Sequence, residues 1–378
     1  MSREVIDVPL SGGTPGNRTA VRMLRYGAPE ARPKAYIHAA LHADEAPGLL
    51  VAHHLAEKLD QADARGEITG QIVLVPAANP LGLAQYINGD HLGRYDLPSG
   101  RNFNRNWPAL GDDIVQRVGG RLTDDANANR AVIRAAIREL IDEHPQATPI
   151  DSLQAILSRE AYDCDLVLDL HCDDEGLMHL FVHPEIWPEV RDLAAELGCH
   201  VVFSQARSGG STFAEAGVEP WLRLAEAFPD CSIPIGCQAI TLELRGFVDV
   251  GDEIARADAS ALINVLRRRR YLSGDADAAP EPLCELTGFD ACDIVRTPQF
   301  GVVVYHAELG ERVKCGQPIA DIVSPPAAGS QERITLHAGT DGLVVTRRLK
   351  KLVAANQVIA KIAGVVPLKH RRGYLLED

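Results

Sequence analysis

His42 and Glu45 stand three positions apart in "ALHADEAPGLL" (40–50), between an apolar run and a stretch with helical spacing. Ligands with this spacing on one bend can face a single ion, and zinc favours histidine nitrogen and carboxylate oxygen in a near-tetrahedral arrangement. A catalytic zinc needs three protein ligands and one open position for water. The pair by itself is also typical of a helix N-terminus at which Asp44 and Glu45 complement the helix dipole.

The third candidate ligand is His171 in "LVLDLHCDDEG" (166–176), at the carboxyl end of an apolar run. Functional groups of parallel sheets collect just past the carboxyl ends of the strands. Asp169, or the acidic string 173–175, could accept a hydrogen bond from the imidazole and orient it. A core histidine that other side chains satisfy is the alternative.

Glu243 lies in "AITLELRG" (239–246), where its neighbours Leu242 and Leu244 are apolar. Burying an unpaired carboxylate is costly, so this side chain needs a partner. Near a zinc-bound water, a carboxylate can take the proton of that water and pass it to a leaving amine, which makes Glu243 a candidate general base. The alternative is a salt bridge to an arginine such as Arg245.

The loop 93–108, "GRYDLPSGRNFNRNWP", is dense in arginine and asparagine. Arginine binds carboxylates through two parallel hydrogen bonds, so a cationic loop in an acidic protein can direct an anionic ligand to one place. A solvated surface loop is the alternative. The candidates for contact with an anionic ligand are Arg94, Arg101, Asn104 and Arg105.

Apolar runs flank these side chains and predict buried strands at 34–41, 71–80, 164–172 and 237–246. The stretch 45–59 has apolar residues at helical spacing and predicts a helix. Strands that alternate with helices and are apolar throughout indicate a sheet covered on both faces. We therefore expect an α/β fold, with a mainly parallel mixed sheet flanked by helices.

The composition changes near residue 273, where "SGDADAAPEPLCE" is rich in Asp, Ala and Pro and is typical of a linker. Short β-like runs separated by glycines and prolines follow it. We predict an α/β catalytic domain over residues 1–274, a linker over 275–285, and a small all-β domain, sandwich-like or barrel-like, with a tail over 286–378.

The chain of 378 residues has a formal net charge of −14, which argues against binding to nucleic acid or acidic membranes. Its first residues, "MSREVIDVPL", lack the apolar core of a signal peptide, and no run is long enough to span a bilayer. The eight cysteines form no C-x-x-C pair, which favours free thiols in a reducing cytoplasm. We expect a cytoplasmic protein without nucleic-acid or membrane partners; the oligomeric state is open, with a homodimer as one expectation.

In chain order, H-x-x-E (42–45), N-P-x-G (79–82), N-R (104–105), D-L-H (169–171) and a strand glutamate resemble the zinc carboxypeptidase superfamily. Within it, "SGRNFNRNWP" and the C-terminal β appendage are similar to the succinylglutamate desuccinylase/aspartoacylase branch. The separations from second to third ligand, 126 residues, and from third ligand to base, 72 residues, are similar to those of the family. The resemblance implies a zinc carboxypeptidase-like fold.

The resemblance also implies roles for the candidate residues. One zinc ion per chain would be held by His42, Glu45 and His171. Glu243 would be the general base and then the general acid of the reaction.

Asn104 and Arg105 would bind a substrate carboxylate, and an arginine upstream of them would stabilise the oxyanion. We favour Arg94 for the oxyanion, with Arg101 as the other candidate. The C-terminal β appendage would narrow the channel, with Tyr305 as one candidate for this.

The implied reaction is the removal of an acyl group from a small anionic N-acyl amino acid or a related molecule by a zinc-activated water. A metallocarboxypeptidase or an esterase could use the same site. A non-catalytic small-molecule-binding protein is the alternative from a different class. The sequence identifies neither the acyl group nor the amine.

Overall fold

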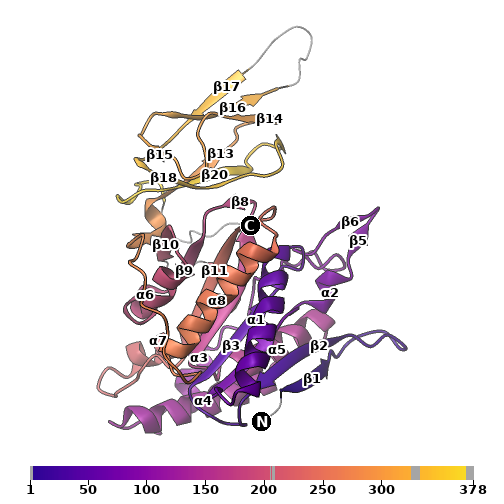
Figure 1. Ribbon diagram of the computed structural model, residues 1–378, viewed down its shortest axis with the longest axis vertical. Helices are drawn as coiled ribbons and strands as arrows, with labels where there is room; N and C mark the ends of the chain where they lie inside the picture. The colour runs from indigo at the N-terminus through magenta and orange to yellow at the C-terminus, as the bar shows by residue number, and fades with distance from the viewer. Residues whose placement is uncertain (1–2, 205, 207–208, 325–332, 372–378) are drawn as a thin grey trace.

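The computed structural model describes residues 3–204, 206, 209–324 and 333–371. A nine-stranded sheet forms the centre of the larger part of the molecule, which we call the α/β region (Figure 1). The strands of this sheet, in spatial order, are β1 (Glu4–Pro9), β2 (Ala20–Tyr26), β4 (Gln71–Val75), β3 (Lys34–Ala39), β7 (Leu166–Asp173), β11 (Gln238–Gly246), β9 (His179–Val182), β10 (Val201–Ser204) and β12 (Leu286–Gly288).

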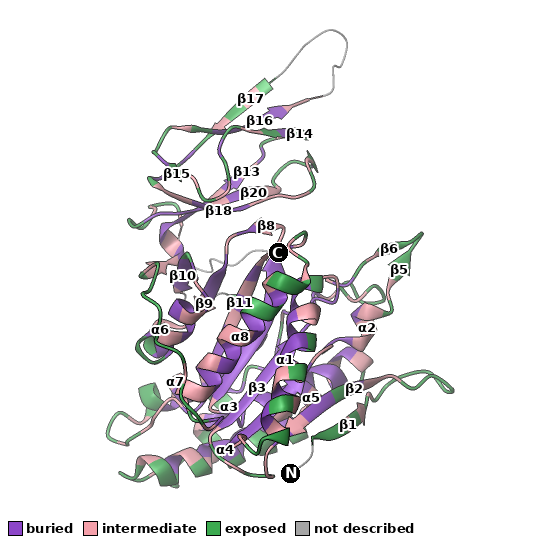
Figure 2. Ribbon diagram, viewed as in Figure 1, coloured by how far each residue is buried: buried purple, intermediate pink, exposed green. Residues whose placement is uncertain are grey.

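The central strands of the sheet are parallel. β4, β3, β7 and β11 pair in the same direction, whereas β9 runs antiparallel to β11, and β1 and β2 add antiparallel strands at one edge. Every residue of β3 and β4 is buried, because both faces of these strands are covered. Figure 2 shows β3 among the purple, buried strands of the sheet. The expected mainly parallel α/β fold is confirmed.

Helices cover both faces of the sheet. α1 (Ala46–Ala64) and α8 (Asp252–Arg268) pack side by side on the face nearest the viewer in Figure 1, and α6 (Trp187–Glu196) packs against α8. None of the described helices is long and apolar enough to cross a membrane. The helices of the other face are α3 (Gly111–Val118), α4 (Ala126–Glu143), α5 (Pro149–Ala161) and α7 (Phe213–Ala227). The short α2 (Pro80–Leu83) is followed by a hairpin of β5 (Tyr86–Ile87) and β6 (Asp90–His91).

Residues 292–363, which we call the C-terminal β region, form two antiparallel sheets beyond one end of the large sheet (Figure 1). They enclose an apolar cluster of their own, as expected for an all-β appendage. One sheet contains β13 (Cys292–Arg296), β20 (Val358–Ala363), β18 (Gly342–Arg347) and β15 (Arg312–Val313); the other contains β17 (Arg333–His337), β16 (Pro318–Val323), β14 (Gly301–Tyr305) and β19 (Leu352–Val353).

The acidic string 173–175 joins the two regions. β8 (Glu175–Gly176) pairs with β18, so backbone hydrogen bonds cross the boundary. The carboxylates of the string form ion pairs with basic side chains of the C-terminal β region instead of orienting His171. The pairs are Lys361 with Asp173, Arg347 and Lys351 with Glu175, and Arg348 with Asp174.

Candidate active site

The turn between β3 and α1 places His42 and Glu45. β3 ends three residues before His42, and α1 begins directly after Glu45. Gly48 lets the first turn of α1 approach the sheet, because a Cβ at this position would lie 3.3 Å from the carbonyl oxygen of Leu170. Glu45 occupies the N-cap position, yet its carboxylate makes no capping hydrogen bond. It is turned instead toward two imidazoles.

These three side chains converge at one buried point. His42 Nδ1 lies 2.9 Å from Glu45 Oε1, and His171 Nδ1 lies 2.8 Å from Glu45 Oε2. The potential ligand atoms all lie within 4.8 Å of one another. Two imidazole nitrogens and a carboxylate oxygen are the donors that zinc prefers, so the residues fit a divalent cation.

The two imidazoles differ in their electrostatic surroundings. Burial, helped by the nearby Arg94 guanidinium, lowers the pKa of His42 to about 4. Burial also disfavours the charged form of His171, but the carboxylates of Asp169 and Glu45 outweigh it and raise the pKa of His171 well above its usual value. His171 must therefore lose a proton before it can bind a metal ion.

Glu243 of β11 stands directly beside His171 of β7, because the two residues are partners in the parallel pair. Its Oε2 is buried and has no hydrogen-bond partner among the described residues. Burial raises the pKa of Glu243 to about 8, and neighbouring carboxylates add to the rise. Arg245, the alternative salt-bridge partner, pairs with Asp258 instead. A buried carboxylate with a raised pKa at a cavity is typical of acid–base catalysis.

Arg94 reaches the same turn from the loop 93–108. Gly93 permits this approach, because a Cβ there would lie 2.2 Å from the backbone nitrogen of Asp44. Arg94 Nη1 lies 3.2 Å from His42 Nδ1 and 3.4 Å from Glu45 Oε1. The loop therefore places one cation directly at the candidate metal ligands.

The other two arginines of the loop, Arg101 and Arg105, lie in different surroundings. Arg101 is not among the described residues that line the cavity; its guanidinium donates to two side chains of α5, at 2.6 and 3.0 Å. Arg105 lines the cavity and packs against Gly210, where a Cβ would lie 2.7 Å from Arg105 Cδ. Asn104 also borders the cavity, but its side-chain amide is engaged by protein atoms.

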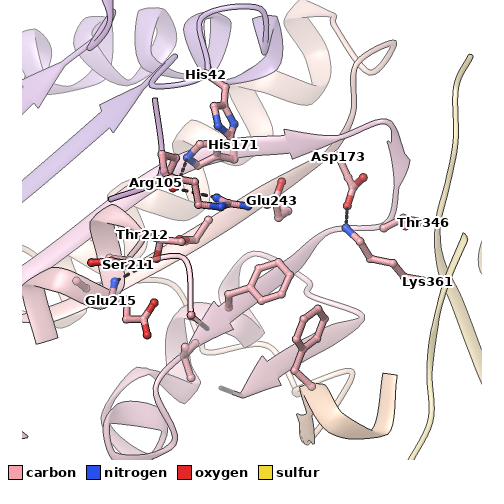
Figure 3. Close-up of a pocket in the computed structure, with 18 of the residues that line it drawn as sticks. His42, Arg105, His171, Asp173, Ser211, Thr212, Glu215, Glu243, Thr346 and Lys361 are labelled. Carbon is pink, nitrogen blue, oxygen red and sulfur yellow. Dashed lines mark hydrogen bonds and ion pairs between the residues drawn. The ribbon is translucent and has the colours of Figure 1, made fainter. Parts of the chain in front are cut away.

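A cavity of about 1650 Å³ connects these residues, and His42, His171 and Glu243 lie along one wall of it (Figure 3). Ser211 and Thr212, just before α7, line one side of it, and Lys361 and Thr346 reach the other side from the C-terminal β region. Tyr305 is not among the described lining residues, since its hydroxyl donates to the backbone of β20.

Sequence reasoning missed Lys361. The available signal was a single lysine in the otherwise apolar run "VIAKIA" (358–363), because lysine is rarely buried without a partner. A second group, His53, His54 and Glu57, could also hold an ion. It lies on α1, away from the cavity lining, and two of its three residues are exposed.

The buried His–Glu–His group beside a cavity-facing glutamate, at the carboxyl ends of parallel strands, is typical of metal-dependent hydrolases. Residues 31–269 match the family model for the succinylglutamate desuccinylase/aspartoacylase catalytic domain. The chain therefore belongs to the succinylglutamate desuccinylase/aspartoacylase family. A search of curated proteins found no match.

Solved structures share this fold over nearly the whole chain. A Shewanella frigidimarina NCIMB 400 protein named for the same family is 23% identical, with a TM-score of 0.84 over 96% of this chain and 97% of that one. A family member from Shewanella amazonensis SB2B is 24% identical, with a TM-score of 0.82 over 95% and 98%. The product-bound ectoine utilization protein EutE (DoeB) from Ruegeria pomeroyi is 16% identical, with a TM-score of 0.67 over 96% and 95%.

Proposed function

We propose that the protein is a zinc-dependent hydrolase that removes an acyl group from a small anionic N-acyl amino acid or a related molecule. The observation that carries this proposal is the convergence of His42, Glu45 and His171 beside Glu243 in one cavity. Family membership supports a deacylase-type hydrolase. Zinc, when bound, would supply a Lewis acid that lowers the pKa of a water and polarises the acyl carbonyl.

Side chains of the protein supply proton transfer, stabilisation of the oxyanion and binding of the substrate carboxylate. Glu243 takes a proton from the attacking water and returns it to the leaving nitrogen, and its pKa of about 8 lies near neutral pH, where such a group is most effective. The Arg94 guanidinium, which Gly93 brings close to Glu45, donates to the oxyanion. Arg105 binds the substrate carboxylate through its planar guanidinium.

The test is a substrate screen with zinc-reconstituted protein. N-acetyl, N-succinyl and N-formyl amino acids are offered, and release of the free amine is measured beside matched esters and short peptides. We expect hydrolysis of an N-acyl amino acid, and Glu243→Gln is the matched control because it removes the base and leaves the three ligands intact. Zinc-loaded protein that cleaves only peptides or only esters would favour those alternatives, and full activity of Glu243→Gln would refute the base assignment.

We also propose one zinc ion per chain and a cytoplasmic setting. All eight cysteines are free, which supports a reducing compartment. A homodimer stays a prediction, which sedimentation of the zinc-loaded protein tests.

A further inference from the structure

Asn102 holds the first histidine of the candidate metal site. Its Oδ1 accepts a hydrogen bond from the backbone N–H of Asn104, 2.9 Å away, which fixes the orientation of the amide. The same oxygen lies 2.8 Å from His42 Nε2 and can only accept, so Nε2 carries the proton. His42 Nδ1 is then left with a lone pair that faces Glu45.

Asn104 holds the second histidine through Asp169. Its Oδ1 accepts from the backbone N–H of Phe213 at 2.8 Å, so its Nδ2 must face the other way, toward Asp169 Oδ2 at 3.3 Å. His171 Nε2 lies 2.8 Å from Asp169 Oδ1. The 3.1 Å between Asn104 Nδ2 and His171 Nε2 therefore separates two donors that both point at Asp169.

His38, on the neighbouring strand β3, also contacts the Asp169 carboxylate. His38 Nε2 lies 2.6 Å from Asp169 Oδ1, and the Tyr36 hydroxyl lies 3.1 Å from His38 Nδ1. The His38 ring packs on Phe213, with ring centres 4.5 Å apart. The Asp169 carboxylate is fully buried, and three N–H donors surround it. Such a carboxylate fixes the imidazole that donates to it.

We infer that Asn102, Asn104 and His38 are positioning residues of the candidate metal centre. This rests on the proposed metal site. Oδ1 of the Asn104 amide accepts from the backbone and one N–H of its Nδ2 donates to Asp169, and the side chain is almost fully buried. Arg105 lies in the cavity wall beside His171 and Glu243 (Figure 3). Asn102, acting on His42, and Asn104, acting through Asp169, would thus leave the Nδ1 atom of each histidine available to bind an ion.

The test measures metal affinity separately from turnover. Asn102→Ala and Asn104→Ala are compared with Arg105→Gln by competition for Zn²⁺ with a chromophoric chelator and by the visible absorption spectrum of the Co²⁺ form. Loss of a residue that orients a ligand typically costs about 10–100-fold in metal affinity. We expect this loss and an altered Co²⁺ spectrum in both asparagine variants, and neither change in Arg105→Gln.

A second pair of variants guards against misfolding, since Asn104 also binds the start of α7. His38→Phe removes the donor to Asp169 from inside the sheet and should weaken metal binding similarly, and His38→Gln, which can still donate, should recover part of it. Wild-type metal affinity in both Asn104→Ala and His38→Phe would overturn the inference. Failure to hydrolyse any substrate would refute the proposed function alone, because the metal measurements do not need turnover.

Discussion

Replacing Lys361 by methionine tests how the C-terminal β region is held over the cavity. The Lys361 ammonium pairs with Asp173, and both side chains are largely buried, with exposed fractions of 22% and 19%. Methionine keeps the length and apolar stem of the side chain, so the packing of β20 changes little. The substitution leaves Asp173 as an uncompensated charge between the two regions.

The magnitude follows from this burial. Breaking a fully buried ion pair by removing one partner costs about 3–5 kcal/mol, whereas exposed pairs contribute about 0–1 kcal/mol. Because about a fifth of each side chain is still exposed, we expect Lys361→Met to lower the free energy of unfolding by about 2–3 kcal/mol. Lys351→Met is the matched control: Lys351 pairs with Glu175 in the same interface, but its side chain is 38% exposed. It should cost less than about 1 kcal/mol.

The assay is urea denaturation followed by circular dichroism, together with native-state hydrogen exchange of the β20 amides, which reports local opening of the C-terminal β region. The double variant Lys361→Met/Asp173→Asn removes both charges and should recover most of the loss, because no unpaired carboxylate remains. Equal effects of Lys361→Met and Lys351→Met, or no recovery in the double variant, would refute the reasoning.

Three further outcomes are expected at the active site. Glu243→Gln should retain metal by elemental analysis and lose about 10²–10⁴ in kcat; metal loss would instead make Glu243 a ligand. Arg94→Gln should lose about 10²–10³ in kcat with metal retained, and a rise in KM alone would argue against an oxyanion role. The pKa of His171 is raised, so protons compete with metal. Apparent affinity in chelator competition at pH 6, 7 and 8 should therefore rise with pH, by about tenfold per unit below that pKa, and pH-independent affinity would contradict this.

The central strands of the sheet could be predicted because a strand buried on both faces has a mostly apolar sequence. β3, β4 and β7 are covered on both faces, so most of their residues are apolar and these runs mark the positions of the strands. α7 was harder to predict, because "STFAEAGVEPWLRLAEA" contains Gly217 and Pro220, which usually interrupt helices. Thr212 caps the helix, and the apolar face that packs on the sheet outweighs both residues.

The sequence indicated His42, Glu45 and His171 as candidate metal ligands, and the structure brings them together. It could not show which arginines of the loop 93–108 lie at this site. Arg94 and Arg101 are the same residue type in the same loop, and only the fold shows that their side chains lie in different places. Gly93 fits against the turn that carries Glu45, which brings Arg94 to the site. The same fold brings α5 to Arg101, where two side chains of that helix engage its guanidinium. Such long-range contacts leave no mark on local sequence.

The ion-pair partners of the acidic string 173–175 could not be predicted for the same reason, because they lie about 180 residues further along the chain. Side chains on a strand alternate between its two faces, so Asp169, His171 and Asp173 of β7 share one face. Along that face, Asp169 holds the imidazole, His171 offers Nδ1 to an ion, and Asp173 anchors Lys361. One strand thus links the support of the candidate metal site to the attachment of the C-terminal β region, so a shift of β7 that disturbed one would disturb the other.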